Sequence, residues 1–236
     1  MNACVRSIVF LFLLIPLEIY AGTKITGRQE IVFSEIPKPA HIWVHDFAAT
    51  SADIPPESAL SGQSEGNDTQ QTAEQISTGR KLGAEIAADL VKEIRKMGLP
   101  AARPTAEERP QINDLVIQGS LISIVSGSAK KRFIVGFGSG ETELKVVVEG
   151  FQMTAEGLRK LGYGSTESTG PKTPGEAAGI LATIATHNPI GLIVSTGIKL
   201  HEHKTGSDTM EGRVKDTAKE IADVLKKRFQ EQGWIE

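Results

Sequence analysis

This chain of 236 residues has little cysteine and no excess of positive charge. Its single cysteine, Cys4, lies before an apolar run, whereas the acylated cysteine of a bacterial lipoprotein directly follows one, so we expect no lipidation. A lone thiol also excludes an internal disulfide, and packing must supply the stability. The net charge is −3, and nucleic-acid binders usually show a basic face. We therefore expect no nucleic-acid partner.

Residues 1–21 have the pattern of a secretory signal peptide. Arg6 supplies the positive charge, an apolar run covers residues 7–17, and the small residue Ala21 ends the segment. Because the run is shorter than the ~20 residues of a membrane-spanning helix, we expect cleavage after Ala21, with an uncleaved anchor as the alternative. Cleavage would remove Cys4 and leave no thiol for catalysis or metal binding.

The remainder is interpreted as an N-terminal extension, 22–39, and one domain, 40–232. The domain opens with a buried strand in the stretch AHIWVHDF, residues 40–47. A long mobile loop is predicted over 48–71, which is rich in Ser, Gly and Pro and has no hydrophobic period. An apolar Gly/Ala-rich insertion is predicted over 175–200.

A long helix is predicted after residue 72. Thr72 and Gln75 form a capping-box pattern, apolar residues then recur with the helical period, and Gly98 ends the run. Gly79 and Gly83 lie on or near the apolar face, where glycine would weaken a solvent-exposed helix. Their positions predict that this helix approaches a sheet closely.

A second helix is predicted near the end of the chain, opened by a capping box of Asp208 and Glu211 and ended by Gly233. Between the two helices, three runs resemble strands of a meander and a fourth is thinner in apolar content: 114–127, 131–137, 141–151 and 156–168. This order predicts an α/β (α+β) sandwich. Its sheet is mixed and mainly antiparallel, with the two long helices packed on one face.

Glycines at every second position raise the question of phosphate binding. A dinucleotide fingerprint needs G-x-G-x-x-G at the start of a helix, but here strand-like alternation follows the glycines, and no Walker lysine is present. The spacing favours a bend or close backbone packing in a sheet. The alternative is an anion-binding nest beside a basic turn. The residues of that weak candidate site are Lys130, Lys131, Arg132, Gly136, Gly138 and Gly140.

Other apparent motifs lack the context that their chemistry needs. Ser128 and Lys131 fit S-x-x-K, but the serine lies in a turn and no S-D-N follows. Four of the five histidines invite a metal interpretation, but no third, fixed ligand is identifiable, so we favour structural histidines over a weak zinc or copper site; the four are His41, His45, His201 and His203. The sequence predicts no catalytic residue, no metal and no cofactor.

Residues 177–198 contain no charged side chain. The stretch could span a bilayer by length, yet His187–Pro189 interrupts its middle. We favour a buried core or insertion, with a self-association surface as the second reading and a membrane-contacting hairpin as the third. The candidate interaction residues are Ile180, Leu181, Ile184, Ile190, Leu192 and Ile193.

The stretch from LVIQGSLISIVSG to ETELKVVVEG, residues 115–150, resembles the central motif of the bacterial family called domain of unknown function 4410. The WVHDFAA strand and the helix ending in MGLPAARP come before it, and the PGEAAG segment and the closing helix come after it, in the order that this resemblance implies, over roughly 40–229. Members are exported proteins with no assigned activity, so the resemblance implies export and transfers no catalytic residue. The absent lipoprotein cysteine is a departure from many members.

These observations predict a non-enzymatic exported protein, periplasmic or associated with the outer membrane. Its expected partner is another envelope protein or a second copy of itself, and membrane contact is not favoured. The alternative is a small-ligand or anion-binding periplasmic module, or a hydrolase, that uses the hairpin of residues 130–140.

Overall fold

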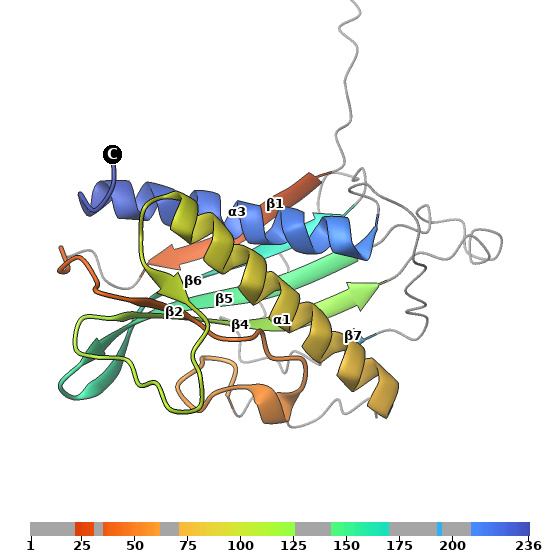
Figure 1. Cartoon of the computed structure of the whole chain (residues 1–236). Coiled ribbons are helices and arrows are strands. Elements are labelled where there is room, and N and C mark those ends of the chain that lie inside the picture. Colours follow the sequence, from red (N-terminus) through yellow and green to blue (C-terminus); the bar gives the residue numbers. More distant parts are fainter. Residues whose placement is uncertain (1–21, 31–34, 62–70, 126–142, 170–192, 195–208) are drawn as a thin grey trace, which may run out of the picture.

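A computed structural model of the chain describes residues 22–30, 35–61, 71–125, 143–169, 193–194 and 209–236. Within these residues one mixed sheet carries two long helices, α1 (Ala73–Lys96) and α3 (Met210–Glu231), on one side (Figure 1). The strands are β1 (Gly22–Glu30), β2 (Ile42–Val44), β3 (Ala101–Ala102), β4 (Leu115–Val125), β5 (Glu143–Thr154), β6 (Gly157–Thr169) and β7 (Ile193–Val194).

The sheet has the strand order β1-β6-β5-β4-β2-β3, and β7 pairs with β4 beyond the end of β2. The long ladders β1–β6, β6–β5 and β5–β4 are antiparallel. The short ladders β4–β2, β2–β3 and β4–β7 are parallel. The predicted α/β fold with a mixed, mainly antiparallel sheet is therefore confirmed.

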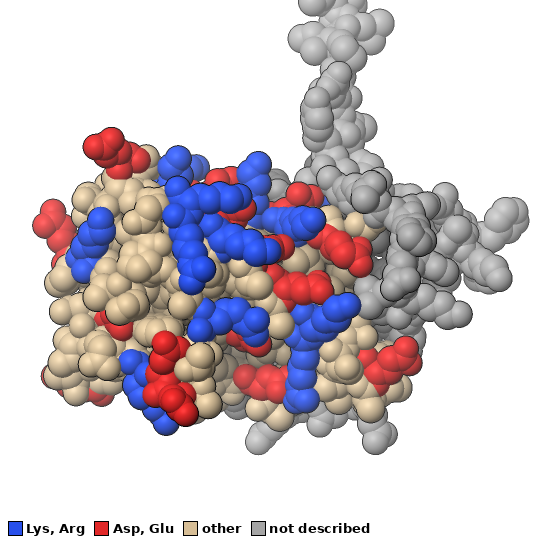
Figure 2. All heavy atoms as spheres, viewed as in Figure 1, with Lys and Arg blue, Asp and Glu red and all other residues tan. Residues whose placement is uncertain are grey.

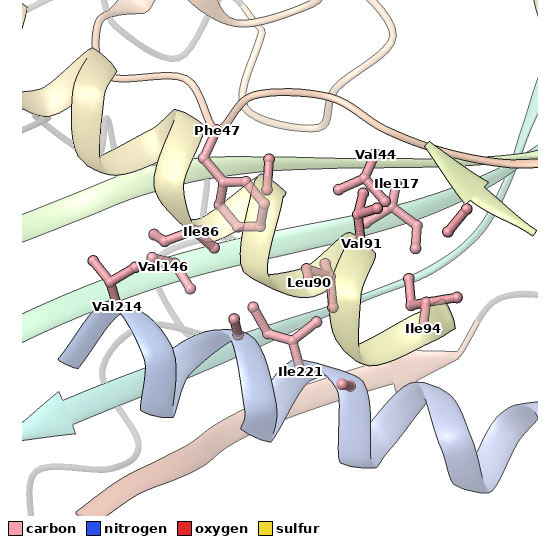
Figure 3. Close-up of a cluster of buried hydrophobic side chains, with 14 of the residues drawn as sticks. Val44, Phe47, Ile86, Leu90, Val91, Ile94, Ile117, Val146, Val214 and Ile221 are labelled. Atoms are coloured by element: carbon pink, nitrogen blue, oxygen red, sulfur yellow. The ribbon is translucent and has the colours of Figure 1, made fainter. Parts of the chain in front are cut away.

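Strand alternation assigns the main core to the helix side of the sheet. Residues of β4 and β5 two positions apart face α1 and α3, and a register shift between Leu121 and Ser123 returns Ile124 to that side. Figure 3 shows these side chains between the two helices and the strands. The cluster includes Val44, Phe47, Ile86, Leu90, Val91, Ile94, Ile117, Leu121, Leu144, Val146, Val214, Ala218 and Ile221.

Helix α1 begins and packs as the sequence predicts. Thr72 Oγ1 accepts a hydrogen bond from Gln75 N at 3.2 Å, and Gln75 Oε1 accepts one from Thr72 N at 2.7 Å. Gly79 and Gly83 are buried, and a Cβ on Gly83 would lie 2.2 Å from the carbonyl oxygen of Phe47. The close approach is confirmed, and the backbone that it meets belongs to the segment directly after β2.

Helix α3 begins one residue later than its predicted cap. The N-cap is Thr209, whose Oγ1 accepts from Gly212 N at 3.0 Å, so the assignment of the cap to Asp208 is wrong. Both residues could accept this bond, and the sequence pattern does not separate neighbouring hydroxyl and carboxylate side chains. The described helices include none that is both long and apolar enough to cross a membrane.

The outer face of the helix layer is charged. Lysine and arginine side chains gather over α3 and the end of α1, with acidic side chains among them (Figure 2). On α1, Lys92 pairs with Asp89 at 2.7 Å and Lys96 with Glu93 at 2.6 Å. Such pairs are typical of a solvated helix surface.

The domain is wider than the predicted 40–232. Residues 22–30, interpreted from the sequence as an extension, form the edge strand β1. At the other end, Gln232 Oε1 accepts from Ile36 N at 2.8 Å, and Lys38 Nζ donates to Trp234 O at 2.9 Å. The sequence GTKITGRQE did not predict this edge strand, because it shows little hydrophobic pattern. Backbone hydrogen bonds attach the strand to the sheet, and they require no such pattern.

The first half of the predicted mobile loop has defined packing. Ala48 forms an isolated bridge with Ser120, a short 3-10 turn covers Ser51–Asp53, and Leu60 is buried. Residues 50–61, named the covering loop from here on, lie against the sheet face opposite the helices. Residues 62–70 lie outside the described part.

Candidate functional site

A carboxylate is buried beneath the covering loop. Glu149 of β5 is 3% exposed and lies on the sheet face opposite the helices, as do its same-face neighbours Val147 and Phe151. Its side chain accepts hydrogen bonds from Ala59 N at 3.0 Å and from Ser58 Oγ. A strand carboxylate thus holds a loop that is 90 residues away in sequence.

Lys160 of β6 balances the charge of Glu149. Its ammonium donates to Glu149 Oε1, and it lies 5.5 Å from the ring centre of Phe151 and 5.9 Å from that of Tyr163. Aromatic faces attract a cation at such distances. Because a buried carboxylate needs a partner and hydrogen bonds to offset its lost hydration, the lysine and the loop together make this position tolerable.

A second tie joins the covering loop to β4. Gln118 Nε2 donates to Glu57 Oε1 at 2.7 Å, whereas Gln118 Oε1 is buried without a hydrogen-bond partner in the described residues. His45 lies close to this tie. Burial lowers the pKa of the His45 imidazole, and the negative charges of Glu57 and Asp46 oppose that shift only in part.

The Glu149 cluster, defined as Ser58, Glu149 and Lys160, contains groups that some enzymes use. A hydroxyl beside a carboxylate and an amine can support nucleophilic or acid–base chemistry when the nucleophile faces a substrate. Here Ser58 is 6% exposed, and its Oγ donates to Glu149 while accepting from Leu60 N at 3.1 Å. The geometry is that of an anchor for the covering loop.

Asp114 is a second buried acid, at the start of β4. It accepts from His41 N at 3.0 Å, from Trp43 Nε1 at 3.0 Å and from Gln111 N at 2.9 Å. These bonds join β2 to the loop before β4. They occupy both carboxylate oxygens with structural donors, so this acid positions backbone.

A family model described as a domain of unknown function, DUF4410, matches residues 42–188, which is more than half of the chain. The chain belongs to the DUF4410 family. No curated protein matches it. Among solved structures, the PelC dodecamer from Paraburkholderia phytofirmans is similar at 10% identity and a TM-score of 0.35, covering 70% of this chain and 96% of that one.

A variant of the same dodecamer is similar at 13% identity and a TM-score of 0.31, covering 70% of this chain and 95% of that one. Likenesses this weak support no statement about the function or assembly of the DUF4410 chain. The membership itself confirms the resemblance that residues 115–150 carry.

The glycine-rich hairpin lies outside the described residues. This holds for all six of its predicted site residues: Lys130, Lys131, Arg132, Gly136, Gly138 and Gly140. Ser128, His201 and His203 also lie outside. Of the remaining histidines, His41 stacks on Trp43 at 5.5 Å between ring centres. No group of three or more His, Cys, Asp or Glu suited to a metal occurs within the described part of the chain.

The predicted interaction segment is represented by one residue. Ile193 lies in β7, whose backbone pairs in parallel with β4 opposite Ser123. Five other predicted residues lie outside the described part: Ile180, Leu181, Ile184, Ile190 and Leu192. The uncharged stretch 177–198 therefore includes a strand of the domain's own sheet.

Sequence reasoning missed the Glu149 cluster. In KVVVEGF, Glu149 alternates with valines and has the pattern of a solvent-facing strand position, while Ser58 falls in a stretch without period. A signal was nevertheless present. Val147 and Phe151, on the same face of β5, are too apolar for an open face, and they indicate that something covers Glu149.

Proposed function

We propose that this DUF4410 chain is an exported envelope protein that acts by binding another protein or a second copy of itself, without catalysis. The signal-peptide pattern of residues 1–21 supports export. Cleavage after Ala21 would keep residues 22–30, which form β1, in the mature chain.

The closed Glu149 cluster is the observation that carries the non-catalytic part of the proposal. Its hydroxyl, carboxylate and ammonium bond to one another and to the loop backbone, under the loop that they hold. A catalytic set needs a nucleophile or base within reach of a substrate atom. A loop anchor needs the closed arrangement observed.

The β7–β4 pairing supports the binding part. Ile193 and Val194, which belong to the uncharged stretch 177–198, pair with β4. An uncharged apolar segment that includes a strand of the sheet suits contact with a protein partner. The same attachment makes an independent membrane hairpin less favourable.

Fractionation of the untagged protein from its native host tests export. We expect the measured mass to equal that of a mature chain beginning at Gly22. We also expect the protein to be recovered from the periplasm, or from membranes after a salt wash. A cytoplasmic protein that keeps residues 1–21 would contradict the proposal.

Light scattering of the purified mature chain tests self-association. Ile184→Asp changes the apolar segment, and Ile112→Asp is the matched control, because Ile112 is a 62% exposed isoleucine in the loop before β4. We expect an assembly that Ile184→Asp dissociates and Ile112→Asp leaves intact. Equal behaviour of both variants would contradict self-association through this segment and leave a different envelope protein as the partner to isolate.

A further inference from the structure

We draw no further inference here: the strongest candidate, the outer edge of the nine-residue strand β1 at one end of the sheet, carries none, because nothing in the described residues shows what covers it.

Discussion

The two faces of the sheet are covered by different kinds of structure. On one face, α1 and α3 bury a continuous apolar cluster that joins both helices to four strands. On the other, two small apolar clusters, around Val147 and around Phe151, flank a buried ion pair under an irregular loop. Regular helices bring a long apolar stripe to the sheet, whereas a loop brings single residues such as Leu60. The helix face therefore buries the larger apolar core, and we expect it to contribute most of the stability.

Truncation of one leucine on each face gives the largest expected contrast. Leu90→Ala on the helix face should reduce the free energy of unfolding by about 2–5 kcal/mol, since its cavity cannot collapse. Leu60→Ala should reduce it much less, because Leu60 belongs to a small cluster whose other buried members are Ile122 and Val147. Urea unfolding followed by circular dichroism measures both. Equal losses would mean that the two faces form one cooperative core.

The second-largest expected loss of stability comes from breaking the Glu149–Lys160 ion pair on the loop face. Lys160→Met leaves Glu149 without its charge partner, and breaking a fully buried pair costs about 3–5 kcal/mol. We expect about 2–3 kcal/mol here, because Lys160 is 19% exposed and water can reach it. The double change with Glu149→Gln should recover much of the loss. Additive losses in this double-mutant cycle would show that the pair is not coupled.

Glycine substitutions compare a crowded position with an open one. Gly83→Ala forces a Cβ into the backbone of Phe47 on the helix face and should reduce stability by about 1–3 kcal/mol. Gly150→Ala is the matched control, because a Cβ there meets no atom within 4 Å. Thermal unfolding of both variants measures the difference. A tolerated Gly83→Ala would disprove the close contact between α1 and the segment after β2.

The smallest expected effect is a pH dependence near the covering loop. Burial lowers the pKa of His45 below the ordinary 6.5, so the unfolded chain takes up a proton at a higher pH than the folded one. Stability should therefore fall as the pH drops below 6.5, by at most about 1.4 kcal/mol per pH unit from this group. His45→Gln should flatten the slope in urea unfolding at pH 5.5–7.5. An unchanged slope would assign the dependence to other groups.

Elements with a local signal were predictable from the sequence. The cap of α1 and its apolar face depend on residues a few positions apart, and so does the alternation of β4 and β5. The edge strand β1 was not, because a backbone ladder with β6 attaches it and requires no apolar pattern.

The site predicted from the sequence and the buried cluster found in the structure lie in different segments. The glycine spacing predicted a weak candidate site in residues 130–140, which lie outside the described part. The Glu149 cluster instead joins a loop to two strands. Ser58 and Glu149 are 91 residues apart, and no short pattern reports such a contact. In the sequence, only the apolar residues Val147 and Phe151, on the same strand face as Glu149, indicated that this face is covered.

The pairing of the two ends of the domain has a consequence for the order of folding. Ile36 is bonded to Gln232, 196 residues away, and Trp234 stacks on Phe229 at 5.4 Å while its indole donates to Ile36 O. If the chain is exported from its N-terminus, as we propose, these last residues emerge at the end. We expect residues 35–38 to wait without partners until then, so that a chain stalled in translocation offers an unfinished edge to chaperones and proteases.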